Sequence, residues 1–166
     1  MLTTVYLIRH GIAAERGLYD QDADRPLTER GVEKTTQVAQ RLRRLNLQLA
    51  LTLASPLVRA RQTAEILQNV GITPAIEVFD ALAPDGDIRH WLAWLACWQP
   101  QNPARSVALV GHQPDLTQWA QQLVGTTDDA RWQLKKAGVI GLQVPNAEDA
   151  LGQSLLFLLV PPRFLL

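Results

Sequence analysis

The chain has 166 residues, 47% of them apolar, and its 16 basic and 16 acidic side chains give a formal net charge of zero. This length and composition favour one folded domain over residues 1–166, and they exclude the strongly basic balance typical of nucleic-acid-binding proteins. The first apolar run is short and ends directly in Arg9 and His10, unlike a signal peptide. No run reaches the ~18 apolar residues of a membrane span. We therefore expect a cytoplasmic protein that binds neither nucleic acid nor a membrane.

Residues 5–8 form a short apolar run that ends in Arg9, His10 and Gly11. This pattern predicts a buried strand whose carboxyl end opens into a polar site, where ligands of open α/β sheets bind. His10 is a candidate nucleophile or proton carrier, and Arg9 is a permanent cation suited to phosphate. Gly11 is expected to let the backbone turn sharply and approach a ligand.

A polar loop over residues 12–26 follows this strand, and an amphipathic helix begins after it. Thr28 is the expected N-cap, because its hydroxyl can accept a hydrogen bond from the first turn. The apolar face of this helix is predicted to consist of Val32, Thr36, Ala39, Leu42 and Leu45. Residues 47–54 are almost continuously apolar, as in a parallel strand covered on both faces. Ser55 is expected to cap a second helix, which ends at Gly71.

The rest of the chain continues to alternate strands and helices. The predicted elements are an edge strand over 74–79, a loop over 80–87, a tryptophan-rich helix with Trp91, Trp94 and Trp98, a strand over 106–110, a helix over 114–124, and strands over 139–144 and 155–160. His90 is expected to be exposed on the tryptophan-rich helix, and the single cysteine, Cys97, to pack in the core. The alternation predicts an α/β fold, a three-layer α/β/α sandwich with a mostly parallel central sheet.

Four cationic or titratable side chains follow three of the predicted strands. Arg9 and His10 follow the first, Arg59 lies in the helix after the second, and His112 comes after Gly111 at the end of the strand over 106–110. Two arginines and a helix N-terminus form an anion pocket, in which one histidine can attack phosphorus. The second histidine would neutralise charge on the phosphoryl oxygens. A metal site is disfavoured, because Arg9 and Arg59 would repel a cation.

Four motifs carry a resemblance to a known family. They are LIRHG at 7–11, LTERG at 27–31, SPLVRARQTA at 55–64 and VGHQP at 110–114. In this order they resemble the histidine phosphatase superfamily, which also contains the phosphoglycerate mutases. The resemblance implies a phosphoglycerate mutase-like fold without cofactor or metal. It also implies that His10 is the phosphorylated nucleophile and that Arg9, Arg59 and His112, with Gly11, bind the phosphate.

The length, the Gly-His-x-Pro motif and the sequence APDGD at 83–87 most resemble the small SixA-type phosphohistidine phosphatases. Members of this type remove phosphate from histidine on a phosphotransfer domain. The resemblance therefore implies a signalling role in which a phosphorylated, histidine-containing phosphotransfer protein is the partner.

The chain departs from larger members of the superfamily in one respect. Those members place a glutamate, the general acid, after the third strand, whereas residues 80–87 contain only the carboxylates of Asp80, Asp85 and Asp87. An ester oxygen leaves poorly without a proton, while imidazole leaves readily from a phosphohistidine. Asp80 remains a candidate acid. The alternative is therefore a broad-specificity small-molecule phosphomonoesterase that uses Asp80 or Asp85. A silent binding module is disfavoured, because a binder needs no nucleophile.

Overall fold

A six-stranded sheet forms the centre of the computed structural model, which describes residues 2–126 and 131–166. Its strands are β1 (Thr3–Arg9), β2 (Leu51–Ala54), β3 (Ile76–Val78), β4 (Ser106–Gly111), β5 (Val139–Val144) and β6 (Leu155–Val160). Their order across the sheet is β3-β2-β4-β1-β5-β6. The first four strands of this order are parallel to one another, whereas β5 runs antiparallel to both β1 and β6. The predicted mostly parallel sheet is confirmed.

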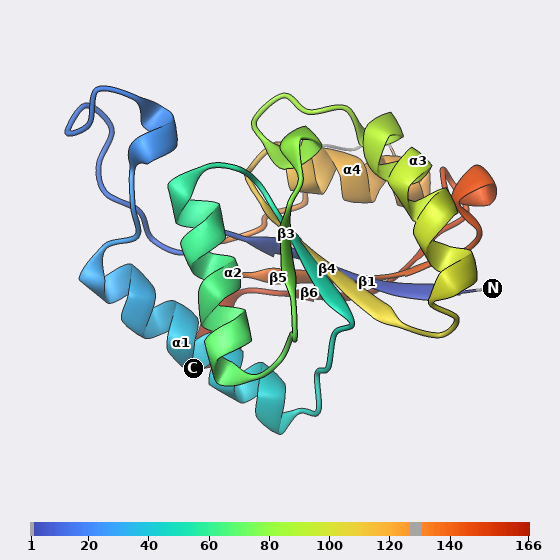
Figure 1. The fold of residues 1–166 in the computed structure, drawn as a ribbon, viewed down its shortest axis with the longest axis horizontal. Coiled ribbons are helices and arrows are strands. Elements are labelled where there is room, and N and C mark those ends of the chain that lie inside the picture. Colours follow the sequence, from blue (N-terminus) through green and yellow to red (C-terminus); the bar gives the residue numbers. More distant parts are fainter. Residues whose placement is uncertain (1, 127–130) are drawn as a thin grey trace.

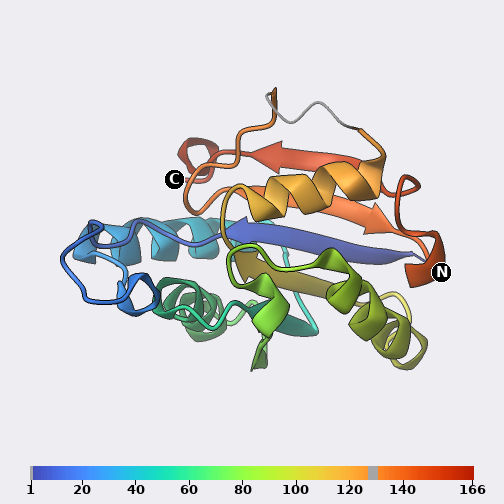
Figure 2. The same ribbon diagram turned by 90° about the horizontal axis from the view of Figure 1, so that it is seen from above.

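Helices cover both faces of the sheet (Figure 1). Helices α1 (Glu29–Arg44) and α2 (Val58–Val70) pack on one face, and α3 (Ile88–Trp98) and α4 (Asp115–Val124) pack on the other. Figure 2 shows α4 lying along β1 and β5. Each face of the sheet contributes to its own apolar cluster, so the predicted three-layer α/β/α sandwich is confirmed.

The register of the parallel strands brings their carboxyl ends to one edge of the sheet. Arg9 at the end of β1 lies opposite Gly111 of β4, and Ala54 at the end of β2 lies opposite Val110. The residues that follow these three strands therefore meet at one place. None of the residues in these three strands is exposed, and β2 is buried throughout.

Helix α1 begins as predicted, and its predicted buried face is correct only in part: Ala39 and Leu42 are buried. The Thr28 hydroxyl accepts a hydrogen bond from Gly31 N at 2.9 Å, so the predicted N-cap is confirmed. Val32 and Leu45, expected on the buried face, are 42% and 58% exposed. The buried residues of the helix are Gly31, Thr35, Val38, Ala39 and Leu42. This face is selected by Gly31, where a Cβ atom would collide with the backbone of Ile12.

Helix α3 corrects the expectation for Cys97, which is exposed rather than packed in the core. The helix buries Trp91 and Leu95, both fully inaccessible to solvent. Cys97 comes two residues after Leu95, about 200° further around the helix, and therefore points outward. His90 is exposed, as predicted.

No helix in the described part of the chain is both long enough and apolar enough to cross a membrane.

Candidate active site

The structure brings together the four side chains that follow the strand ends. His10 comes directly after β1, His112 directly after β4, and Arg59 lies in the first turn of α2, which follows β2. The ring centroids of His10 and His112 are 5.2 Å apart, and Arg59 Nε lies 3.3 Å from His10 Nε2. With Arg9, these residues line a cavity of about 680 Å³.

The hydrogen bonds of His10 fix the position of its proton. Nδ1 lies 2.7 Å from the carbonyl oxygen of Gly11, which can only accept, so Nδ1 carries the hydrogen. Nε2 accepts a hydrogen bond from Arg59 and therefore presents a lone pair. Burial, together with the nearby charges of Arg59 and Arg9, lowers the pKa of His10 to about 3. The ring is therefore neutral at neutral pH, as a nucleophile must be.

His112 is held by Ser55, the residue after β2. His112 Nε2 lies 2.7 Å from Ser55 Oγ, which itself accepts a hydrogen bond from Leu57 N. A hydroxyl can donate one hydrogen bond and accept two, so this contact fits either ring tautomer; when Ser55 donates to Nε2, the proton of the ring lies on Nδ1. Among the described residues, buried Nδ1 has no partner. Burial and the charge of Arg59 lower the pKa of His112 to about 4.

Sequence reasoning assigned Ser55 to helix capping, and this needs correction. The N-cap of α2 is Leu57, and the Ser55 side chain instead links Leu57 N to His112. The strand ends of β2 and β4 lie side by side, so Ser55 can reach His112. The Ser-Pro pair after an apolar strand therefore does mark a structural role, but the serine positions a histidine instead of capping the helix.

Asp22 is a site residue that the sequence did not reveal. It lies in the loop after β1, and its carboxylate Oδ2 accepts a hydrogen bond from Arg59 Nη2 at 2.9 Å while its backbone oxygen accepts from Nη1 at 2.8 Å. Arg25 Nε also donates to Asp22, at 2.8 Å. Although burial raises the pKa of Asp22, the bonds to Arg59 and Arg25 lower it overall. Asp22 therefore stays ionised and occupies the donors of Arg59 that a phosphate would use.

Thr63 ties α2 to the end of β1. Its hydroxyl accepts a hydrogen bond from Gly11 N at 3.1 Å and donates to the carbonyl oxygen of Arg59 at 2.8 Å. The Gly11 N–H is thus used within the protein, and a Cβ atom at Gly11 would collide with the Thr35 hydroxyl. In this structure the missing side chain of Gly11 allows close packing against α1, whereas the sequence suggested that it allows close approach to a ligand.

Lys136 adds a cation from the segment before β5. This segment is fixed to the strand end, because Ala137 N donates to the carbonyl oxygens of Arg9 and His10, and Arg9 Nη1 donates to that of Leu134. Lys136 lines the cavity together with Arg9. Burial and the neighbouring arginines, Arg9 first among them, lower its pKa. Its segment carries no recognisable motif, so no sequence signal indicated this position.

The carboxylates of the loop over 80–87 lie outside the cavity. Asp80 is exposed at the start of a short 3-10 helix, and Asp87 accepts from Arg89 N as the cap of α3. From this loop, Pro84 lines the cavity. The carboxylates that do line it are Glu15 and Asp22. Within the described residues, no group of three or more His, Cys, Asp or Glu side chains could hold a metal ion.

Comparisons with known proteins identify the family of this chain. Residues 5–83 match the model of the histidine phosphatase superfamily (branch 1). The chain is 48% identical over 163 residues to an uncharacterized protein of Picosynechococcus sp. (strain ATCC 27264 / PCC 7002 / PR-6), with 98% of each chain covered. It is 32% identical over 111 residues to the phosphohistidine phosphatase SixA of Escherichia coli (strain K12), with 66% of this chain and 67% of that protein covered.

Solved structures share the fold. A structure of the protein histidine phosphatase SixA complexed with tungstate has a TM-score of 0.85 at 23% identity, covering 98% of this chain and 99% of that one. A putative SixA from Agrobacterium tumefaciens has a TM-score of 0.76 at 24% identity, covering 95% and 97%. The chain belongs to the histidine phosphatase superfamily. The predicted family, its phosphoglycerate mutase-like fold and the enzyme class, a phosphatase, are confirmed.

Proposed function

We propose that this enzyme is a phosphohistidine phosphatase, which removes the phosphoryl group from a histidine of a phosphotransfer protein. The observation that carries the proposal is the neutral His10, whose Nε2 lone pair faces Arg59 inside a cavity also lined by Arg9 and His112. A nucleophilic nitrogen surrounded by donors suits in-line attack on a phosphoryl group. The similarity to SixA of Escherichia coli, a phosphohistidine phosphatase by name, supports the choice of substrate.

In the proposed first step, the hydrogen bond from Arg59 Nε to His10 Nε2 breaks, the freed lone pair of Nε2 attacks phosphorus, and the bond between phosphorus and the substrate nitrogen breaks. The electron pair of that bond stays on the substrate ring, which leaves as neutral imidazole because solvent has protonated its other nitrogen. The incoming phosphoryl group displaces Asp22 from Arg59, whose guanidinium then binds two phosphoryl oxygens. His112 Nδ1, which has no partner among the described residues, donates to a third oxygen.

In the proposed second step, water attacks the phosphorus of phosphorylated His10. The bond to Nε2 breaks, its electron pair returns to the ring, and the proton of the water passes to the departing phosphate. While phosphorylated, the ring retains the Nδ1 hydrogen and is positively charged. The Gly11 carbonyl, 2.7 Å from Nδ1, stabilises that charge.

The choice of phosphohistidine over a phosphoester follows from the acid groups. Asp80 does not line the cavity, and of the two carboxylates that do, Asp22 remains ionised between two arginines and Glu15 is exposed to solvent. An alkyl ester needs a proton on its leaving oxygen, a contribution of ~100- to 10,000-fold in rate. The imidazole of a phosphohistidine leaves without a proton from the enzyme. We therefore infer that alkyl phosphates are poor substrates.

The test compares kcat/KM of the wild type and of Asp80→Asn on a phosphorylated histidine phosphotransfer domain, an aryl phosphate and an alkyl phosphate. We expect rapid turnover of the phosphoprotein, slower turnover of an aryl phosphate with an acidic phenol, and almost none of the alkyl phosphate. Asp80→Asn should leave turnover of the phosphoprotein nearly unchanged. Efficient alkyl phosphate hydrolysis that collapses in Asp80→Asn would contradict the proposal and identify a broad-specificity phosphomonoesterase.

A further inference from the structure

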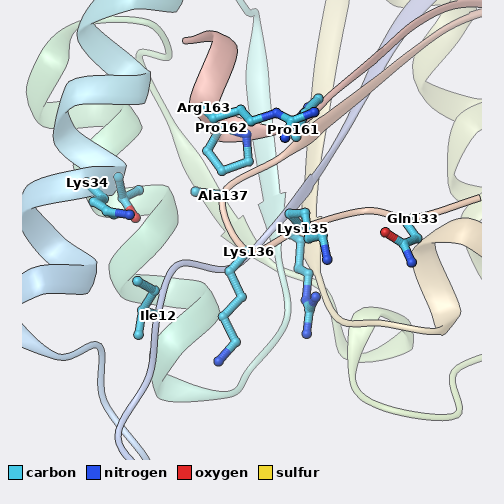
Figure 3. A pocket seen from close by; sticks show the side chains of 11 residues that line it. Ile12, Lys34, Gln133, Lys135, Lys136, Ala137, Pro161, Pro162 and Arg163 are labelled. Atoms are coloured by element: carbon cyan, nitrogen blue, oxygen red, sulfur yellow. The ribbon is translucent and has the colours of Figure 1, made fainter. Parts of the chain in front are cut away.

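A second cavity, of about 790 Å³, adjoins the catalytic one and has no part in the mechanism above. We call it the basic groove. Figure 3 shows side chains from four segments around it: Ile12 after β1, Lys34 on α1, Lys135 and Lys136 before β5, and Arg163 in the C-terminal segment. Arg9 and Lys136 line both cavities, so the groove and the catalytic pocket meet at these two residues.

The charge of the basic groove has one sign. The cations in its lining are Arg9, Lys34, Lys135, Lys136 and Arg163, and the lining contains no carboxylate among the residues that the structure describes. The whole chain has a formal net charge of zero, so this segregation is not a consequence of composition. In the described part of the chain, Lys34, Lys135 and Arg163 take part in no salt bridge. Their charges are therefore available to an outside partner.

The remaining lining is mostly apolar. Ile12, Ala137, Pro161 and Pro162 contribute carbon surface between the cations (Figure 3). A groove with apolar patches and a charged rim suits an amphipathic peptide chain better than a lone inorganic ion. Its volume is within the range of sites that take a short peptide segment or a small organic ligand.

We propose that the basic groove binds an acidic segment of the phosphoprotein substrate, close to the phosphohistidine that enters the catalytic pocket. This inference rests on the function proposed above and specifies the partner: a protein with glutamate or aspartate residues near its phosphohistidine. Carboxylates of that segment pair with Lys34, Lys135 and Arg163. The junction at Arg9 and Lys136 places this segment beside the phosphoryl group.

The probes are two synthetic peptides of equal length, each with one phosphohistidine, flanked by glutamates in one and by glutamines in the other. Phosphoimidazole serves as a substrate too small to reach the basic groove. The variant reverses three groove charges that lie outside the catalytic pocket, Lys34→Glu, Lys135→Glu and Arg163→Glu. A matched control, Arg41→Glu, Arg44→Glu and Arg105→Glu, applies the same change of charge at exposed positions that line neither cavity.

We expect the wild type to hydrolyse the glutamate peptide with a kcat/KM at least about tenfold above that of the glutamine peptide, mainly through KM. This advantage should shrink as ionic strength rises, because salt screens exposed charges. The groove variant should lose the advantage and keep its rate on phosphoimidazole, while the matched control keeps both. Equal melting temperatures of the three proteins would show that the losses do not reflect unfolding.

Several results would overturn the inference. Equal rates on the two peptides in the wild type would exclude recognition of an acidic segment, and so would a groove variant that retains the preference. If tripolyphosphate inhibits the wild type but not the groove variant while the peptides are treated alike, the groove binds a small polyanion instead. If the wild type hydrolyses alkyl phosphates and neither phosphohistidine peptide, the proposed function itself fails, and this inference fails with it.

Discussion

The proton of His10 is positioned by two neighbours of opposite character. The carbonyl of Gly11 requires a hydrogen on Nδ1, and the guanidinium of Arg59 requires a lone pair on Nε2. Neither neighbour can accept the other tautomer, so the ring is held in the form that the proposed attack on phosphorus requires. Burial keeps it neutral. At the residue scale, the chemistry of this site is therefore set by hydrogen bonds to main chain and arginine.

The two arginines of α2 provide a matched comparison. Arg59 is 3% exposed and bonds His10 and Asp22, whereas Arg61, two positions later, is exposed. Two residues turn about 200° around a helix, so only one of them can face the cavity. Arg59→Ala should lower kcat/KM by about a hundredfold, or about 3 kcal/mol of transition-state stabilisation. Arg61→Ala should leave it nearly unchanged, and equal losses in steady-state assays would contradict the assignment.

Sequence reasoning located Arg9, His10, Arg59 and His112, because each follows an apolar strand whose end can be identified from composition. Asp22 could not be located in this way. It lies in a loop without periodicity, and its partner Arg59 is 37 positions away in the sequence. Such contacts exist only once the loop has folded over the N-terminus of α2.

At the scale of elements, the site depends on how α2 is fastened to the end of β1. The Thr63 hydroxyl makes the link, accepting from Gly11 N and donating to the Arg59 carbonyl. Arg59 carries that carbonyl group, and His10 directly precedes Gly11 in the chain. A displacement of α2 along the sheet would therefore separate the nucleophile from its arginine.

Thr63→Val tests this link with little change of shape. It removes both hydrogen bonds and leaves the Gly11 N–H buried without a partner, which should cost about 1–3 kcal/mol of unfolding free energy in urea titrations. It should also lower kcat, because the distance between His10 and Arg59 is no longer fixed. Thr63→Ser retains the hydroxyl and should retain most of both quantities. A valine variant as stable and active as the wild type would show that the link is dispensable.

The sequence predicted the bounds of β5 and β6 correctly, but it did not show that β5 is antiparallel, and it predicted only part of the buried face of α1. Apolar runs mark a strand, yet they do not say which way it is paired; here β5 lies antiparallel beside β1. For α1, the apolar residues Val32 and Leu45 suggested a face that the packing of Gly31 on Ile12 rotates away from the core. Close backbone contact, which composition does not reveal, decided the orientation.

At the scale of the whole molecule, the site makes the fold sensitive to acid. His10 and His112 are 6% and 3% exposed, and burial lowers their pKa values to about 3 and about 4. In the unfolded chain both histidines have pKa values near the ordinary 6.5. As the pH falls below 6.5, the unfolded chain therefore binds protons that the folded chain does not bind. The free energy of unfolding must decline over this range and is unaffected by these groups above it.

The expected decline is about 2 kcal/mol per histidine between pH 6.5 and 5, at about 1.4 kcal/mol per pH unit. Urea unfolding of the wild type and of His112→Asn at pH 7 and pH 5 measures it. The variant should lose less stability than the wild type on acidification, by about the contribution of one histidine. An identical loss in both proteins would mean that His112 is not kept neutral by the fold.

The covalent intermediate on His10 is the central element of this account, and trapping it is the most direct test. The wild type is mixed with a ³²P-labelled phosphohistidine peptide, quenched in alkali within the first turnover, digested and mapped. We expect label that is stable to base and labile to acid, located on His10, and absent from a folded His10→Ala variant that no longer turns over. Label on a serine, on an aspartate or on His112, or full activity in His10→Ala, would contradict the mechanism.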